Sequence, residues 1–173
     1  MASFVELLEP ILDDLYRYAR RLERDPIAAE DLLQDGLLRG LRKHGQLREA
    51  ITFRVWMTRV LRTTSINRSQ KRTELAMAED DVQRIGPDLR PVRSPEDFVG
   101  DVRLGERISL ALDDLPPDRR EAVWLVDGLG FSFTEAAIVL DQPVGTVASR
   151  VSRARSALRH HLRSDALERG VIG

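Results

Sequence analysis

The sequence predicts an all-α protein in which two small helical domains are joined by a flexible acidic linker. Apolar residues recur at helical spacing over most of the chain, and one acidic stretch with prolines and a glycine interrupts that pattern. An apolar content of 42% and a charged content of 32% suit a folded, helix-rich protein. The predicted boundaries are residues 1–72 for the N-terminal domain, 73–100 for the linker, 101–165 for the C-terminal domain and 166–173 for a tail.

The N-terminal domain is predicted to contain three helices. The first spans Phe4 to Arg24 and stops at Asp25, because the proline that follows favours a new helix start. The second runs from about Pro26 to Lys43, and a loop containing Gly45 leads to a third from about Thr52 to Arg72. Three helices of this length can form one compact bundle.

The linker is predicted from composition. The stretch from Thr73 to Pro95 has an acidic run at residues 79–81, one glycine, three prolines and no sustained apolar period. Helical spacing returns from Asp97 to Leu115, where two prolines end that helix and introduce the next one at Asp118.

A helix-turn-helix is predicted in the C-terminal domain. Ser132 followed three residues later by Glu135 is typical of a capping box, so a helix should begin at Phe133 and end near Leu140. Asp141 tolerates the left-handed backbone of a tight turn, and a longer helix follows from about Val144 to Leu162. Together these elements favour DNA binding.

The last predicted helix has two distinct faces. One face is an apolar stripe that should be buried, made of Val144, Val147, Val151, Ala154, Leu158 and Leu162. The opposite face carries Ser149, Ser152, Arg153 and Ser156, with Arg150, Arg155 and Arg159 on its flanks. Such side chains suit a helix that enters the major groove, although the same pattern also describes a solvated basic surface helix.

Charge is segregated along the chain although the formal net charge is only −1. Residues 1–72 hold 14 Lys and Arg against 10 Asp and Glu, residues 73–105 hold four against eight, and residues 106–163 hold eight of each. A basic N-terminal domain is compatible with a nucleic-acid partner, which the average charge alone would argue against.

Several function classes are excluded or disfavoured. The absence of cysteine excludes disulfides and thiolate metal sites, and no apolar run approaches the roughly 18 residues of a membrane span. We therefore expect a cytoplasmic protein without membrane insertion. His44, His160 and His161 have no metal-ligand spacing and no phosphate-binding glycine loop is present, so we expect no metal, no cofactor and no catalytic residues.

The third predicted helix collects cations and aromatic residues. Its cations are Arg54, Arg59, Arg62, Arg68, Lys71 and Arg72, and they are interleaved with Phe53, Trp56, Thr63, Ser65 and Asn67. This combination suits single-stranded or melted DNA, where phosphates are neutralised and bases stack or form hydrogen bonds. The alternative is that the aromatic residues are buried and the arginines solvated, and for Trp56 we favour burial.

The second predicted helix exposes a leucine among acids. If Ala29, Leu33, Leu37 and Gly40 face inward, the outer face holds Asp31, Asp35, Leu38 and Arg42, with Gln34 at its edge. An outward leucine among acids indicates a protein-docking surface. The alternative is that Leu38 packs on a neighbouring helix.

Four segments resemble extracytoplasmic-function (ECF) sigma factors of the sigma-70 family. Residues 28–35 (AAEDLLQD) resemble the helix that binds RNA polymerase, and residues 53–56 (FRVW) resemble the start of the helix that melts and reads the minus-ten element. Residues 115–121 (LPPDRRE) and 143–147 (PVGTV), followed by residues 149–155 (SRVSRAR), resemble the family's C-terminal helix-turn-helix domain. The resemblance covers nearly the whole chain in the family's order, apart from the linker.

The resemblance implies three binding surfaces. Polymerase core would be bound through Asp31, Leu32, Gln34, Asp35 and Leu38. The minus-ten element would be bound through Arg54, Arg59, Arg62, Thr63, Asn67, Arg68, Lys71 and Arg72, and the minus-thirty-five element through Thr146, Ala148, Ser149, Arg150, Arg153 and Arg155. The implied partners are bacterial RNA polymerase core, promoter DNA and an anti-sigma factor.

The sequence departs from the family at positions used for DNA. Family members commonly have Asn where Thr63 stands, Asp where Asn67 stands and a basic residue where Ala148 stands. These departures motivate an alternative function, a sigma mimic that sequesters an anti-sigma factor without initiating transcription. An autonomous repressor is a weaker alternative, because no dimerisation helix is evident.

Overall fold

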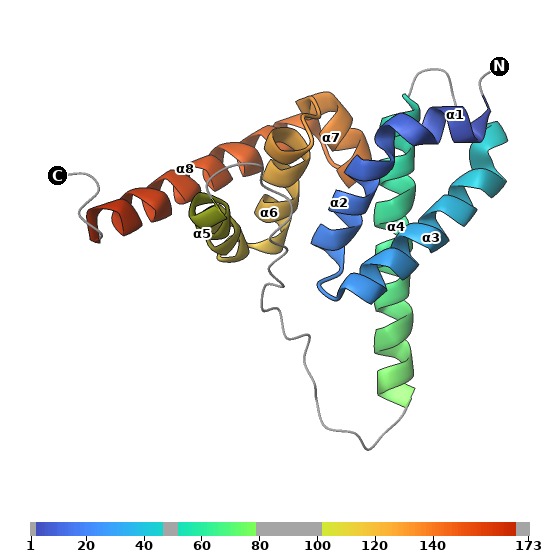
Figure 1. Cartoon of the computed structure of the whole chain (residues 1–173), viewed down its shortest axis with the longest axis horizontal. Helices are drawn as coiled ribbons and strands as arrows, with labels where there is room; N and C mark the ends of the chain where they lie inside the picture. Colours follow the sequence, from blue (N-terminus) through green and yellow to red (C-terminus); the bar gives the residue numbers. More distant parts are fainter. Residues whose placement is uncertain (1–2, 47–51, 79–101, 169–173) are drawn as a thin grey trace. The chain divides into compact units, whose positions relative to one another are not determined.

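The computed structural model describes residues 3–46, 52–78 and 102–168, and the regular elements in these ranges are all helical (Figure 1). The chain divides into two compact units, Met1–Leu89 and Arg90–Gly173. The predicted all-α class is therefore confirmed. The predicted linker lies outside the described residues from residue 79 onward.

The first predicted helix is interrupted near its start. The structure has α1 (Phe4–Leu8), a 3₁₀ turn η1 (Glu9–Ile11) and α2 (Leu12–Leu22) where one continuous helix was predicted. Pro10 lies in the 3₁₀ turn, and a proline inside a helix removes a hydrogen bond and clashes with the preceding turn. The sequence interpretation overlooked this interruption.

The next two helices begin where they were predicted to begin. Helix α3 spans Pro26–Lys43, and the Asp25 carboxylate caps it by accepting a 2.8 Å hydrogen bond from the Ala28 N–H. A 3₁₀ turn η2 (His44–Gln46) follows, and α4 spans Phe53–Ala78. Helix α4 thus continues through six residues that were assigned to the linker, which is a correction. Residues 73–78 contain neither proline nor glycine, so nothing in them stops the helix.

Two glycines allow α3 and α4 to pack closely. A Cβ atom at Gly36 would lie 2.7 Å from Leu61 Cδ1, and one at Gly40 would lie 2.5 Å from the Met57 sulfur. On α3 the inward residues include Leu32 and Gly36, while Leu33 and Leu37 are only half-buried. Two of the four residues predicted to face inward, Leu33 and Leu37, therefore lie one position away from the residues that do.

The second unit contains the predicted helix-turn-helix. Its elements are α5 (Val102–Asp113), α6 (Pro117–Val123), a π-helical turn η4 (Trp124–Gly128), α7 (Phe133–Leu140) and α8 (Val144–Glu168). Ser132 accepts from the Glu135 N–H at 3.2 Å, and its own N–H donates to the Glu135 carboxylate at 2.9 Å. Asp141 has φ 55° and ψ 50°, the left-handed conformation expected of the turn.

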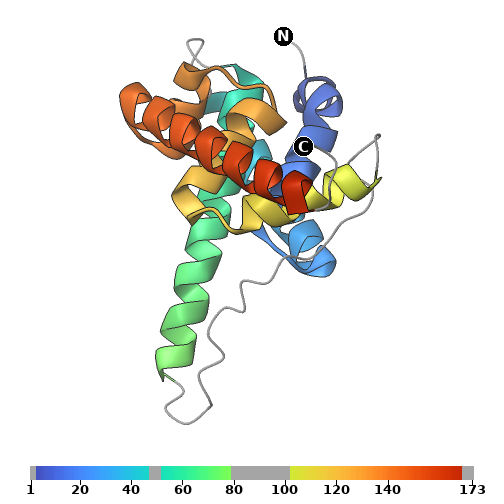
Figure 2. The same ribbon diagram turned by 90° about the vertical axis from the view of Figure 1, so that its left-hand side faces the viewer.

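Helix α8 buries most of the predicted stripe. Val147, Val151 and Ala154 are fully buried, and Leu158 and Leu162 are half-buried. Val144 does not belong to the stripe, because it lies in the exposed first turn and is 43% exposed. The helix is long and continuous (Figure 2), and it extends six residues beyond the predicted end, through part of the predicted tail.

Candidate nucleic-acid and polymerase interfaces

The predicted DNA-binding residues of α4 lie on two different faces. On a helical wheel with about 100° per residue, Arg54, Arg68 and Arg72 lie within about 20° of the direction of buried Leu61. Arg59, Thr63, Asn67 and Gln70 lie within about 60° of the opposite direction, and all four are exposed. The helix therefore separates the predicted set into an inward group and an outward group.

The inward arginines form ion pairs with the other helices of their unit. Arg54 donates from Nε and Nη2 to one oxygen of Asp14, at 3.0 and 2.7 Å. Arg72 donates to Glu23 at 3.2 Å, and Glu23 is only 8% exposed. Arg68 lies 3.8 Å from Asp35 on α3. These arginines connect α4 to α2 and α3, a role that the sequence interpretation did not foresee.

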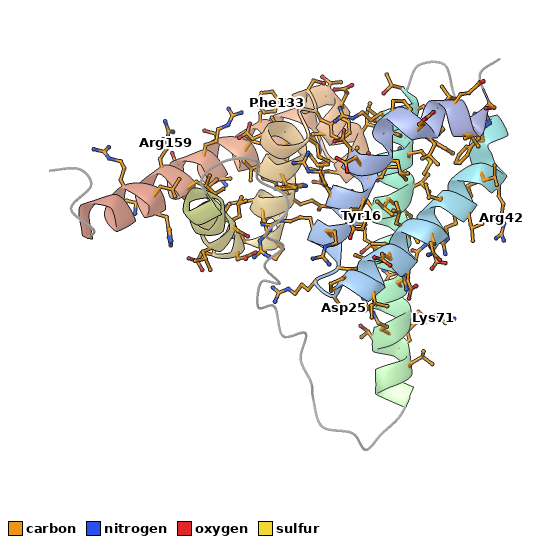
Figure 3. The ribbon with its side chains drawn as sticks, viewed as in Figure 1. Tyr16, Asp25, Arg42, Lys71, Phe133 and Arg159 are labelled. Atoms are coloured by element: carbon orange, nitrogen blue, oxygen red, sulfur yellow. The ribbon has the colours of Figure 1, made fainter. Side chains whose placement is uncertain are left out.

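The outward face of α4 combines a cation, polar side chains and an aromatic ring. Thr63 donates its hydroxyl proton to the Arg59 carbonyl at 2.8 Å, while Asn67 is exposed one turn later. Trp56 is half-buried on this side of the helix, so the expectation that it is a core residue is only partly met. Arg62 and Lys71 lie on opposite flanks, and Lys71 projects away from the helix (Figure 3).

Sequence reasoning missed three residues of this outward face. Trp56 was assigned to the core, and Ile66 and Gln70 were not considered, although both are exposed. Each lies three residues from a residue of the predicted set, Trp56 from Arg59, Ile66 from Thr63 and Gln70 from Asn67, and this spacing was a sufficient signal.

The outward face of α3 has the predicted chemistry with one correction. Asp31, Gln34 and Asp35 are exposed, and Leu38 is 52% exposed. Leu32, which was predicted to contact polymerase, is fully buried in the bundle and cannot reach a partner. Leu41, which was not assigned to this surface from the sequence, is 56% exposed one turn beyond Leu38 and enlarges the apolar part of the surface.

The residues predicted to form the outer face of α8 are exposed. Ser149 and Arg153 are exposed, and Thr146 and Ala148 are half-buried. Ser149 donates its hydroxyl proton to the Thr146 carbonyl at 2.9 Å. Arg159 also projects from the helix (Figure 3).

Two predicted DNA-binding arginines of α8 are held by carboxylates of their own unit. Arg150 Nε lies 3.1 Å from Asp118 at the start of α6. Arg155 donates two hydrogen bonds to Asp127 in the π-helical turn, at 2.9 and 2.6 Å. The hydrogen bonding that Arg155 donates to Asp127 is the main cause that raises the pKa of Arg155 above its ordinary value, and desolvation opposes it. Arg153 differs from both, because it is exposed on the outer face of the helix.

The described ranges contain no group of three or more His, Asp or Glu side chains placed to hold a metal ion. No helix in these ranges is long and apolar enough to span a bilayer. What they do present is a capped helix-turn-helix and, in a separate unit, a long helix with an exposed cationic and polar face. A helix-turn-helix combined with a second exposed basic helix defines a DNA-binding transcription protein.

Comparison with known proteins identifies the family. Residues 7–74 match the sigma-70 region 2 model, and residues 105–158 match the sigma-70 region 4 model. The chain is 35% identical over 170 residues to ECF RNA polymerase sigma factor SigE of Mycolicibacterium smegmatis, covering 97% of this chain and 65% of SigE. It is 34% identical over 167 residues to ECF RNA polymerase sigma factor EcfG of Rhodopseudomonas palustris, covering 92% of this chain and 89% of EcfG.

A solved structure agrees with this assignment. The sigma factor RpoE of Bartonella quintana, crystallised with the anti-sigma factor NepR, is similar with a TM-score of 0.75 and 30% identity over 94% of this chain and 98% of that chain. CnrH, solved with the cytosolic domain of CnrY, has a similar fold with a TM-score of 0.65 and 22% identity over 94% of this chain and 88% of that one. The chain belongs to the ECF sigma factors of the sigma-70 family. These proteins are not enzymes; they direct transcription initiation by RNA polymerase.

Proposed function

We propose that this chain binds RNA polymerase core through the outward face of α3, captures the minus-ten element with the outward face of α4 and reads the minus-thirty-five element with α8. This assignment of three roles is supported most directly by the position of the three faces on three different helices. Each lies on a helix whose opposite side is packed in its own unit, so all three remain available for partners.

The α3 face suits a protein partner. Leu38 and Leu41 provide apolar area, and Asp31 and Asp35 provide a negative rim. Apolar anchors surrounded by polar residues are typical of binding hot spots. The partner surface should therefore combine an apolar groove with basic residues.

Replacing Leu38 with Asp tests this docking surface. We expect Leu38→Asp to abolish holoenzyme formation without loss of helicity, because the anchor would become a charge buried against the partner. The matched control is Val5→Asp, which places the same charge at an apolar residue of α1 that is 69% exposed. Native gel shifts with core polymerase measure assembly, and normal assembly by Leu38→Asp would show that the docking surface lies elsewhere.

The α4 face suits melted DNA. Arg59 supplies a cation, Thr63 and Asn67 supply hydrogen-bonding groups, and Trp56 supplies a half-buried aromatic ring. Stacking and backbone neutralisation are the usual means of holding single strands, while amide and hydroxyl groups can select among bases. Because Thr63 and Asn67 depart from the residues common in the family, we infer a base preference specific to this chain.

The α8 face suits duplex DNA. A helix-turn-helix inserts the N-terminal part of its second helix into the major groove, and Arg153 and Ser149 are exposed in that part. Arginine forms bidentate hydrogen bonds with guanine, so Arg153 is the residue we assign to base reading. Arg150 and Arg155, which are paired with carboxylates, are assigned to positioning and to phosphate contact.

An anti-sigma factor is the proposed regulatory partner, supported by the similarity to a sigma factor crystallised with NepR. Binding to polymerase and promoter DNA places the protein in the cytoplasm under this proposal.

Reconstitution with bacterial core polymerase and a library of random promoters tests the whole proposal. We expect run-off transcripts from templates that share two short motifs. If the chain binds an anti-sigma factor but neither comigrates with core polymerase nor supports transcription, it is a sigma mimic and the proposal fails.

A further inference from the structure

Asp127 has no role in the proposed function, although it forms a two-point ion pair with Arg155 of α8. Arg155 donates from Nε and Nη2 to the two different carboxylate oxygens, at 2.9 and 2.6 Å. Such fork-to-fork pairing fixes the plane of a guanidinium as well as its position. The side chains of Arg155 and Asp127 are 46% and 43% exposed, and ion pairs this exposed contribute little to folding. Stability alone is therefore a weak reason for this geometry.

The backbone that carries Asp127 is firmly held. The Leu129 N–H donates to the Trp124 carbonyl, five residues back, at 3.0 Å, which makes η4 a π-helical turn. Such turns are rare and occur frequently at functional sites. The turn is tightly packed, because a Cβ atom at Gly128 would lie 3.0 Å from two atoms of the buried Trp124 ring. Asp127 can therefore fix Arg155 rather than follow its motion.

The pair leaves one edge of the Arg155 guanidinium open. A guanidinium has five N–H donors, and Asp127 accepts from Nε and from one Nη2 hydrogen. The second Nη2 hydrogen and both Nη1 hydrogens remain, and Asp127 is the one partner of Arg155 within the described part of the chain. The outer edge made by Nη1 and Nη2 matches two oxygens of a second anion, such as a phosphate.

Arg155 lies on a flank of α8 that would face a wall of the major groove. On a helical wheel, Arg150 and Arg155 lie about 70° to either side of the middle of the buried stripe. When the outer face of a helix points at the base edges, its flanks point toward the phosphates of the two strands. Arg150 is held on the other flank, where its Nε lies 3.1 Å from Asp118. Each flank thus presents an arginine fixed by a carboxylate.

We propose that Asp127 is a positioning residue, which holds Arg155 so that its outer edge binds one backbone phosphate of the minus-thirty-five duplex. This inference rests on the proposed function of α8. Without Asp127 the long side chain would have to be ordered on binding, which weakens the complex. A pure charge effect has the opposite sign, because removing an acid beside a polyanion should strengthen binding.

A double-mutant cycle separates these two effects. Asp127→Ala, Arg155→Gln and the double variant are assembled into holoenzyme and titrated with a promoter fragment. Asp127→Ala should weaken binding about two- to tenfold, the cost of ordering one long side chain. Arg155→Gln should make the slope of log affinity against log salt shallower by about 0.9. In the Arg155→Gln background, Asp127→Ala should cause no further loss.

The matched control is Asp114→Ala. Asp114 also faces α8, where its carboxylate lies 3.6 Å from His161, six residues beyond Arg155. This variant loses the same charge away from the flank, so it should bind the promoter as tightly as wild type. Thermal unfolding of each full chain checks the fold. If Asp127→Ala does not fold, Asp127→Asn, which keeps the shape of the side chain and one acceptor, replaces it and should show a smaller loss of the same sign.

Methylphosphonate substitution locates the contact. When the phosphates around the minus-thirty-five element are neutralised one at a time, one position should abolish the losses caused by Arg155→Gln and by Asp127→Ala together. A merely structural role of the ion pair would not depend on any single phosphate. The two losses should also persist when the minus-thirty-five letters are substituted, because phosphate contacts do not read sequence.

Three outcomes overturn the inference. Equal or tighter binding by Asp127→Ala, or the same loss with and without Arg155, means that Asp127 does not position Arg155. Losses that no single methylphosphonate abolishes mean that Arg155 binds no particular phosphate. Loss of holoenzyme assembly by Asp127→Ala means that the pair belongs to a polymerase-binding surface. A wild-type holoenzyme whose affinity does not depend on the minus-thirty-five element would instead overturn the proposed function of α8.

Discussion

Arg153 and Arg155 lie two positions apart on α8 but have different surroundings. Arg153 is exposed on the recognition face, whereas Arg155 is fixed by two hydrogen bonds to Asp127. The Nε and one Nη2 hydrogen of Arg155 are already donated to Asp127, so this guanidinium has fewer donors and less freedom to align with a base than Arg153. Residue type alone therefore does not decide which arginine reads DNA.

This difference leads to a prediction for two alanine variants. Arg153→Ala should weaken binding to the preferred minus-thirty-five element by about 1–3 kcal/mol and relax selection at one base pair. Arg155→Ala should leave base selection unchanged, because Arg155 of the wild-type protein is paired with Asp127 and is not assigned to base reading. Competition binding of holoenzyme against promoters substituted at each upstream position measures both effects. An equal loss on all sequences for Arg153→Ala would reassign that residue to phosphate contact.

Individual side chains were predicted less reliably than the helices that carry them. Arg54, Arg68 and Arg72 were grouped with Arg59 because they are cations on one helix, but the helical period places them toward the bundle. The carboxylates that pair with them come from α2 and α3, up to 49 residues away. No local pattern reveals such partners, although the helical period alone would have separated the inward arginines from the outward one.

At the scale of elements, local signals determined helix starts better than helix ends. The start of α3 was predicted from Pro26 and that of α7 from the capping box at Ser132, and the structure caps them with Asp25 and Ser132 through hydrogen bonds within four residues. The ends of α4 and α8 were placed too early, the first because the linker was extended back from its acidic, proline-containing part and the second because the helix was ended at the last residue of its apolar stripe. Arg, Lys and Glu are good helix formers, and without proline or glycine they do not end a helix.

The contact of α3 with α4 depends on a residue that lacks a side chain. Gly36→Val should destabilise the N-terminal unit by about 1–3 kcal/mol, because its Cβ would overlap buried Leu61. Each unit contains one tryptophan, Trp56 or Trp124, so urea unfolding followed by fluorescence in a Trp124→Phe background reports on the N-terminal unit.

The matched control for this prediction is Gly145→Ala. A Cβ at Gly145 meets no atom within 4 Å, and alanine favours the helix, so its own unit should be equally stable or slightly more stable. Followed through Trp124, this variant should show no loss of unfolding free energy. A Gly36→Val protein as stable as wild type would mean that the two helices can separate without cost.

At the scale of the whole molecule, the two units have separate hydrophobic cores. Leu15, Tyr18 and Leu61 are buried in one, and Leu125, Val147 and Val151 are buried in the other. Substitutions on the DNA face of one unit therefore should not disturb packing in the other. The two-domain organisation followed from the sequence because the pattern of apolar residues stops between the units and then resumes.

Independence of the units predicts additive effects on promoter binding. In holoenzyme, Arg59→Ala on α4 combined with Arg153→Ala on α8 should cost the sum of the single losses within about 0.3–0.5 kcal/mol, since distant sites without shared partners are additive. Ser149→Ala combined with Arg153→Ala is the comparison pair. Because these residues are neighbours on one helix, the losses of binding free energy should not be additive. Equilibrium binding of six holoenzymes to one promoter measures both cycles: the wild type, the three single variants and the two double variants. A coupling above about 1 kcal/mol between Arg59 and Arg153 would show that capture of one promoter element changes how the other is held, which two independently packed units do not predict.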